Sequence, residues 1–294
     1  MNLFAGLEKF GFSGMGDVDI LEEESQGNKR QAAKQVKKVE KPVEEKDLVL
    51  SKTVTCPVCD NKFHTLVVKT GKVRSQESDF DLRPIPTIID KTKYDACACP
   101  HCGYAALNST FMSLIPAQMK LVRNEIGSKF RSIKDQEYET YTYEQAVDRF
   151  KLALVSTMVK RGKLSEKSYT CLKIAWLYRE MLKTAPEGTE EQKAKKAQMK
   201  AEYDEFYRQA YEGFIKASST EMPPFVGSID SNTMDFMLAN MSVYFGEYET
   251  ASKLVARLLS NQNLPSRVKD KCVDLKQKII EDVKKQNAAQ KQQQ

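Results

Sequence analysis

Two pairs of cysteines, each separated by two residues, constrain this chain more than any other feature of its sequence. They are Cys56-Pro57-Val58-Cys59 and Cys99-Pro100-His101-Cys102. This spacing lets one tight turn direct both sulfurs at the same ion, and four thiolates complete the tetrahedral shell that zinc prefers. Asp60 and Gly103, which follow the pairs, tolerate the left-handed backbone expected at the end of such a turn. We therefore predict a closed structural Zn²⁺ site with the ligands Cys56, Cys59, Cys99 and Cys102.

The thiols leave two other chemistries open. A catalytic zinc ion would need an open coordination position, which four cysteine ligands do not leave. A thiol-disulfide oxidoreductase is the sharper alternative, because Cys99-Pro100-His101-Cys102 has the letters of a strongly oxidising motif. That chemistry requires the first cysteine at a helix N-terminus, where the helix dipole lowers the thiol pKa. The short β-like runs around both pairs favour structural zinc instead.

The other cysteines and the histidines add little to this site. Cys97 is either an alternative ligand or, more simply, a small strand residue. Cys171 and Cys272 lie on apolar helical stripes and are expected to be buried. His64 and His101 are the only histidines, too few to build a Ser-His-Asp or Cys-His arrangement. We therefore expect no enzymatic activity.

The sequence gives no sign of export or of membrane insertion. No segment reaches the roughly 18 consecutive apolar residues that cross a bilayer. The N-terminus lacks a basic start followed by an apolar run. We expect a cytoplasmic protein whose seven cysteines stay reduced.

Both ends of the chain are predicted to be disordered. Residues 1–48 contain too little apolar surface to offset their chain entropy, and residues 284–294 lose the apolar stripe of the preceding helix. The start of the chain carries a short apolar helical face, made by Leu3, Phe4, Leu7 and Phe10. This face serves either as a docking peptide or as a tether that folds back on the protein.

The two central segments predict an α+β fold. Residues 49–115 show short β-like runs beside the cysteine pairs, as in a zinc ribbon. Residues 116–283 show helical periodicity. Their helix boundaries are marked by a capping box at Thr142, a stop at Gly162, a cap at Ser165 and a break at Pro223-Pro224.

Apolar stripes in the helical segment come in pairs joined by short turns. The first two consist of Val147, Phe150, Leu154 and Met158, and of Ile174, Ala175, Tyr178 and Leu182. Such pairs stack into a helical solenoid, whose inner groove binds extended or helical peptides. Gly246, Tyr248 and Ala251 match part of a tetratricopeptide repeat, although Asp235 stands where a tryptophan is usual. We predict a tetratricopeptide-like domain of irregular helix pairs.

A loop between the cysteine pairs carries two acids, Asp79 and Asp81. In an extended chain they share one face, where they can hold a cation or divide acid and base roles. The simpler interpretation is structural. In that case Arg74 and Arg83 pair with the acids, and Leu82 and Pro84 anchor the loop against the ribbon.

Three sequence blocks in a fixed order carry a family resemblance. They are the Cys-Pro-x-Cys pair at Cys56, the run that includes Arg74 and continues from Ser78 to Pro84, and the block from Cys99 to Ala105. With these blocks the chain resembles the bacterial family called domain of unknown function 2225. The resemblance covers about residues 50–270 and implies a bacterial cytoplasmic origin, with no known activity.

Taken together, these features predict a non-enzymatic zinc-binding adaptor that binds a protein or peptide in its helical groove, with no membrane contact. The formal net charge of +6 keeps a second function open, a nucleic-acid-binding zinc ribbon. Its contacts would come from Lys52, Lys62, Lys69, Lys72 and Arg74. Acids interspersed with the other cations of the helical half weaken this alternative. The thiol-disulfide oxidoreductase is a further alternative.

Overall fold

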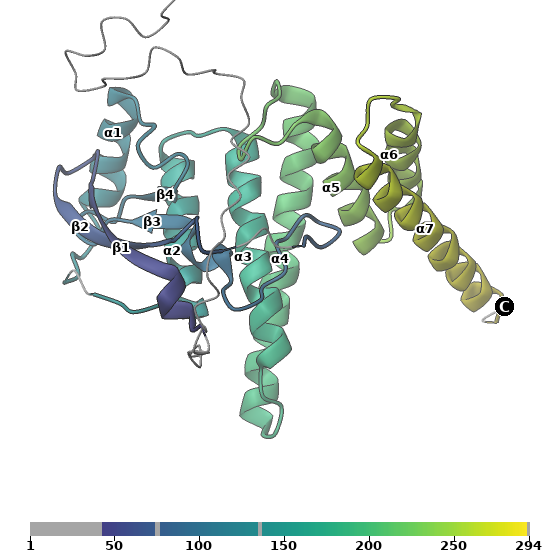
Figure 1. Cartoon of the computed structure of the whole chain (residues 1–294), viewed down its shortest axis with the longest axis horizontal. Helices are drawn as coiled ribbons and strands as arrows, with labels where there is room; N and C mark the ends of the chain where they lie inside the picture. The colour runs from purple at the N-terminus through teal and green to yellow at the C-terminus, as the bar shows by residue number, and fades with distance from the viewer. Residues whose placement is uncertain (1–42, 74–76, 135–136, 293–294) are drawn as a thin grey trace, which may run out of the picture. The chain divides into compact units, whose positions relative to one another are not determined.

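In the computed structural model, the described residues are 43–73, 77–134 and 137–292. Of the disordered segment predicted at residues 1–48, residues 1–42 with their apolar face lie outside the described residues, whereas residues 43–48 are described and include a short helical turn that buries Leu48. From Val43 onward the chain forms one compact unit, in which a small β region is followed by helices (Figure 1). The predicted α+β fold class is confirmed. Among the described residues, the helices lack a stretch long and apolar enough to cross a bilayer.

Two small antiparallel sheets form the β region. The first pairs β1 (Val49–Thr55) with β2 (Lys62–Val68), and the second pairs β3 (Ala96–Ala98) with β4 (Ala105–Leu107). Short 3-10 helices precede them, η2 (Glu45–Leu48) before β1 and η3 (Lys91–Tyr94) before β3. Each sheet is a hairpin whose turn contains one cysteine pair.

The helical region begins with α1 (Pro116–Val122), which continues into a π-helical turn, η4 (Arg123–Gly127). It continues with α2 (Tyr143–Val159), α3 (Leu164–Thr184), α4 (Glu190–Thr220), α5 (Ser231–Tyr244), α6 (Tyr248–Ser260) and α7 (Ser266–Gln292). Consecutive helices from α2 to α7 pack against each other, as expected of helices joined by short connections. α7 extends to Gln292, inside the segment predicted as a frayed tail, because Lys, Gln and Ala have high helix propensity even without an apolar stripe.

Most of the predicted helix boundaries are present. Thr142 Oγ1 accepts from the Gln145 N–H at 3.2 Å, and Gln145 Oε1 accepts from the Thr142 N–H at 3.0 Å, which completes the capping box before α2. α4 ends at Thr220, shortly before the double proline. At the end of α2, however, the left-handed residue is Arg161 (φ 55°), one position before the predicted Gly162.

The N-terminus of α3 is capped by a residue that the sequence analysis did not identify. The prediction of Ser165 as the cap is wrong, since its hydroxyl is buried without a hydrogen-bond partner among the described residues. Glu221, which follows α4, accepts with Oε1 from the N–H groups of Leu164 at 2.6 Å and Ser165 at 3.1 Å. A carboxylate at this end of a helix satisfies free donors and opposes the helix dipole favourably.

Replacing Glu221 by Ala is expected to lower the free energy of unfolding by about 1–2 kcal/mol, the usual effect of losing a helix cap. Urea denaturation followed by circular dichroism measures the change. The matched control is Glu281→Ala, which removes an exposed carboxylate in the interior of α7 that accepts from Gln277 Nε2 at 2.9 Å and is expected to have no resolvable effect. Equal stability losses in the two variants would contradict the capping role.

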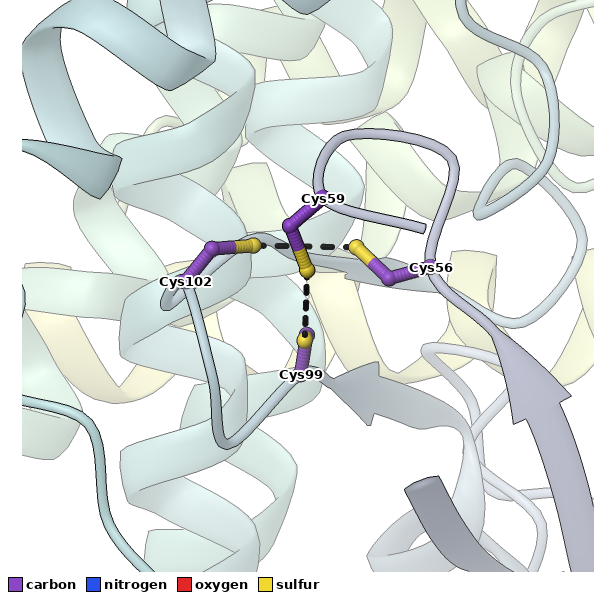
Figure 2. A group of neighbouring side chains, drawn as sticks. All are labelled: Cys56, Cys59, Cys99 and Cys102. Carbon is purple, nitrogen blue, oxygen red and sulfur yellow. Dashed lines mark hydrogen bonds between the residues drawn. The ribbon is translucent and has the colours of Figure 1, made fainter. Parts of the chain in front are cut away.

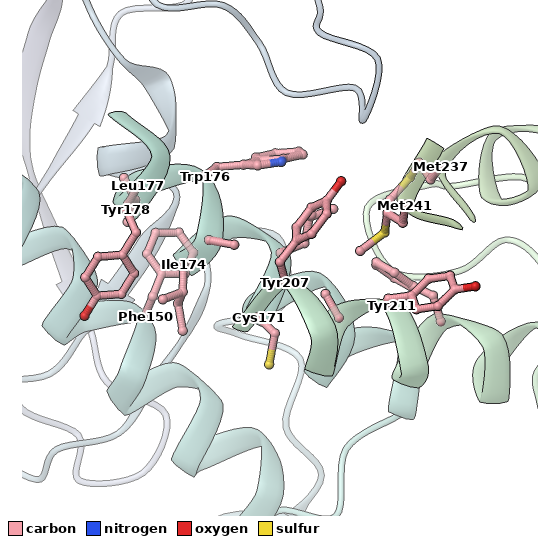
Figure 3. Packing of buried hydrophobic residues seen from close by; sticks show 14 of the residues in the cluster. Phe150, Cys171, Ile174, Trp176, Leu177, Tyr178, Tyr207, Tyr211, Met237 and Met241 are labelled. Atoms are coloured by element: carbon pink, nitrogen blue, oxygen red, sulfur yellow. The ribbon is translucent and has the colours of Figure 1, made fainter. Parts of the chain in front are cut away.

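One core joins the β region to the helices. A buried cluster combines residues of α2, α3, α4 and α5 with Ala96 of β3 and Leu107 of β4, and Figure 3 shows its helical part. The Ala105 N–H also donates to Ser156 Oγ of α2 at 3.1 Å. Shared packing therefore crosses the boundary that the sequence analysis places between residues 115 and 116.

Candidate metal centre

The structure brings together the sulfurs of Cys56, Cys59, Cys99 and Cys102, all within 4.8 Å of one another (Figure 2). Sγ of Cys56 lies 3.6 Å from that of Cys102, and Sγ of Cys59 lies 3.7 Å from that of Cys99. These separations exceed the roughly 2.05 Å of a disulfide bond. Three of the four side chains are buried and Cys59 is half-buried. This cluster of thiols can hold a metal ion.

The two cysteine turns have equivalent backbone hydrogen bonds. The Asp60 N–H donates to Cys56 O at 3.0 Å, and the Gly103 N–H donates to Cys99 O at 3.1 Å. Asp60 (φ 59°) and Gly103 (φ 74°) both adopt the left-handed conformation predicted from the sequence. Each turn thereby directs its two sulfurs toward the opposite pair.

The second turn requires glycine for space as well as for conformation. A Cβ atom on Gly103 would lie 2.4 Å from Cδ2 of Phe130. We expect Gly103→Ala to lower the free energy of unfolding of the metal-loaded protein by about 1–3 kcal/mol, measured by urea denaturation. Asp60→Gly is the control, because glycine adopts the same conformation without strain. A larger loss for Asp60→Gly than for Gly103→Ala would contradict this account.

Polar groups around the sulfurs counter their charge. The Val58 N–H lies 3.5 Å from Cys56 Sγ, and Asn61 Nδ2 lies 3.4 Å from Cys59 Sγ. Arg123 of η4 donates to Val58 O through Nη2 at 2.5 Å and through Nε at 3.2 Å. If the four thiolates hold a divalent ion, the site carries a net negative charge, and a guanidinium bound to the first turn would oppose that charge. No motif in the sequence identified Arg123, because η4 lies far from the cysteines along the chain.

Without a cation, four thiols this close cannot all ionise. Hydrogen bonds from Cys102 and Cys56 lower the pKa of the Cys99 thiol. Hydrogen bonding to Cys102 and Cys99, together with burial, raises the pKa of the Cys56 thiol. The thiols therefore share protons when no ion is bound, and a divalent cation relieves the repulsion among their thiolates.

The remaining cysteines and histidines lie outside this cluster. Cys97 is buried on β3, and burial raises the pKa of its thiol to about 12. Cys171 and Cys272 are buried in the helical cores, as predicted. His64 lies on β2 and His101 lies in the second turn, and neither belongs to the group of four thiols.

The loop that carries Asp79 and Asp81 is bound to the helices. Asp81 is only 1% exposed and receives hydrogen bonds from Arg179 of α3 at 3.1 and 2.5 Å and from Trp176 Nε1 at 3.0 Å. Asp79 accepts from Arg179 Nη1 at 3.3 Å. Leu82 packs against the helical cores, which corrects the prediction that it anchors the loop against the ribbon. Both acids therefore have a common helical partner.

Arg83 does not pair with these acids, contrary to the sequence analysis. Its Nη2 lies 2.5 Å from Glu180 Oε2 and 3.6 Å from Asp90 Oδ2, with the side chain 2% exposed. The other predicted partner, Arg74, lies outside the described residues. Trp176 and Arg179 were not predicted as partners of the loop, because their spacing of three residues beside a predicted apolar stripe is the only signal that the sequence gives for them.

An α+β fold with a helical C-terminal region and four clustered cysteines defines a protein with a candidate metal site. The model of domain of unknown function 2225, described as "Uncharacterized protein conserved in bacteria", matches residues 49–279. The chain belongs to this family, which confirms the resemblance drawn from its sequence blocks. No curated protein and no solved structure matches the chain.

Proposed function

We propose that this protein is a non-enzymatic cytoplasmic adaptor, in which a structural zinc ion holds the β region and the tetratricopeptide-like helices bind a protein or peptide partner. The geometry of the four thiols is the observation that carries the proposal. The helical surface supplies the binding function, and the zinc ion keeps the β hairpins folded against it.

Zinc suits the separations between the sulfurs. With Zn–S bonds of about 2.3 Å, two ligands of a tetrahedral ion lie about 3.8 Å apart. The pairs at 3.6 and 3.7 Å are close to that value. Tetrahedral thiolate sites are typical of zinc and of iron, and elemental analysis of the purified protein separates the two metals.

The surroundings of the thiols favour a structural ion over redox chemistry. Four cysteine ligands leave no open position for a substrate. Cys99 and Cys102 lie in the turn between β3 and β4, whereas an oxidising Cys-Pro-His-Cys motif needs a helix N-terminus to stabilise its thiolate. The closed coordination shell and the position of the cysteines in a β turn both support a structural, non-catalytic metal site.

A groove over α2, α3 and α4 is the candidate surface for the partner. It is lined by Leu154 and Met158 of α2 and by Phe206 of α4, around a cavity of about 480 Å³. Met158 is 58% exposed although it ends a predicted apolar stripe. Lys167 and Glu205 also line the groove, so a peptide with an apolar face and charges of both signs is complementary to it.

The proposal predicts one zinc ion per chain and a partner that depends on Met158. Affinity capture from the native host, with the wild-type protein and Met158→Glu as baits, should recover the partner only with the wild type. Met222→Glu is the matched control, because Met222 is 83% exposed and is not among the residues that line the groove. Equal capture by both variants would contradict the groove.

Oligonucleotide binding by the purified wild-type protein tests the alternative function, a nucleic-acid-binding zinc ribbon. Salt-dependent binding to oligonucleotides at low ionic strength would favour that function over the adaptor. Phe63, an aromatic residue of β2, is only 1% exposed, so it offers no stacking platform beside Lys62. We expect no such binding.

A further inference from the structure

A cavity of about 170 Å³ lies between the second cysteine turn and α2. Pro100, Phe130 and Leu152 contribute apolar walls, and Lys134 and Arg149 contribute positive charge. An apolar protein cavity of about 150 Å³ accommodates a ring the size of benzene. The space is therefore sufficient for a compact organic group.

Arg149 is the unusual member of this lining. Its Cζ lies 4.0 Å from the centroid of the Tyr141 ring, which fixes the guanidinium plane, and its Nη1 is buried without a hydrogen-bond partner among the described residues. Other buried or half-buried cations of this protein have a carboxylate partner, as do Arg83, Lys160 and Arg179. Arg149, in contrast, forms no ion pair within the described residues. A half-buried cation without a counter-charge is costly. An anion in the cavity would supply the guanidinium with a counter-charge; Nη1 itself is closed to solvent, so the anion would contact the other edge of the group.

We propose that this cavity binds a carboxylate carried on a compact apolar group. A carboxylate matches the planar fork of an arginine side chain, and Lys134 at the rim adds long-range attraction. Asp148 also lines the cavity, so Arg149, Lys134 and Asp148 together leave a net charge of +1, which matches a ligand with one negative charge. The ligand is a free small acid or the C-terminal residue of a peptide, since both present the same chemistry.

The cavity is separate from the groove over α2, α3 and α4, so its ligand does not depend on the proposed adaptor function. Ala98, Cys99 and Pro100 form one of its walls. The site therefore requires a folded second turn, and binding is measured on the full-length metal-loaded protein.

The test compares 3-phenylpropionate with 3-phenylpropanamide by isothermal titration and by NMR at low salt. The acid is expected to bind saturably, and the amide at least about tenfold more weakly, because it lacks the charge that Arg149 recognises. Equal affinities for acid and amide, or no binding of the acid at about 10 mM, would overturn the proposal.

Substitutions of the lining residues then show which side chains contribute to the affinity for the acid. Arg149→Met should weaken acid binding at least about tenfold without affecting the amide, and Lys134→Met should weaken it by a smaller factor. Lys253→Met, on α6 and outside the cavity, should change nothing. If Arg149→Met does not fold, the exposed Lys134 and the comparison of acid with amide on the wild type remain decisive.

A short peptide that ends in phenylalanine, with a free or an amidated C-terminus, identifies the source of the carboxylate. Tighter binding of the free-acid peptide than of 3-phenylpropionate indicates a peptide ligand. Binding of 3-phenylpropionate alone indicates a small acid. Each of these results supports the site, whereas measurable binding of both peptides with the same affinity contradicts it.

Discussion

Removal of the proposed zinc ion is expected to unfold the β region and to release four reactive thiols per chain, those of the clustered cysteines. Structural zinc in small domains supplies an apparent folding free energy of about 10–16 kcal/mol at neutral pH. Neither two-stranded sheet is stable by itself in water. Hydrogen exchange measured before and after addition of a chelator should therefore show loss of protection in β1 to β4.

The shared core makes α2 sensitive to the same treatment. Ala96 and Leu107 are buried among residues of α2 and α3, so unfolding of β3 and β4 exposes apolar surface on these helices. We expect partial loss of protection in α2 and full retention in α6 and α7, which pack in a separate cluster. Unaltered protection of β1 to β4 in metal-free protein would contradict a structural role for the ion.

Two cysteine variants serve as a matched pair for this experiment. Cys59→Ser removes a proposed ligand and should lower the metal content measured by elemental analysis, whereas Cys97→Ala should keep one ion per chain. In intact protein near pH 8, Cys97 and Cys171 should resist thiol reagents, because burial raises the pKa of each thiol to about 12. If Cys97→Ala loses the ion while Cys59→Ser keeps it, Cys97 is a ligand in place of Cys59.

The candidate metal site was predictable because its determinants are local in the sequence. Spacing within each cysteine pair sets the geometry of one turn, and Asp60 and Gly103 adopt the backbone that such a turn needs. The periodicity of apolar residues likewise predicts the helices, because burial on one face requires it. The α+β class and the short strands follow from these local patterns.

Contacts between distant residues were beyond the sequence analysis. Glu221 caps a helix that starts at Leu164, and Arg123 binds the first cysteine turn through Val58 O. A hydroxyl near a helix start predicts a cap at Ser165, yet the carboxylate of Glu221, just after α4, accepts from the N–H groups at this helix start. A single sequence gives no information on which distant side chain caps a helix or binds a turn.

Asp81→Asn is expected to produce a large stability loss although Asp81 lies outside the metal centre. Asp81 is 1% exposed, and Arg179 is 21% exposed in its side chain. Removing one charge from a buried ion pair leaves the other uncompensated and typically costs about 3–5 kcal/mol, with the partial exposure of Arg179 favouring the lower end. Urea denaturation of the two proteins measures the difference.

Asp79→Asn is the matched control within the same loop. Its carboxylate is 42% exposed and contacts Arg179 at 3.3 Å, so the expected loss is below about 1 kcal/mol. A double-mutant cycle of Asp81→Asn with Arg179→Met should give a coupling energy of about 2 kcal/mol, since the two side chains share two hydrogen bonds. Additive losses would show that the pair contributes nothing specific.

The zinc content and the partner capture of Asp81→Asn show whether the loop has a role beyond stability. Lys271 Nζ of α7 donates to Ser78 O and Oγ at 3.1 Å, so the loop joins α3 to α7. If Asp81 only holds the loop, Asp81→Asn lowers stability while zinc content and partner capture stay unchanged below the unfolding transition. Loss of partner capture in a fully folded Asp81→Asn protein would instead place the loop in the binding surface.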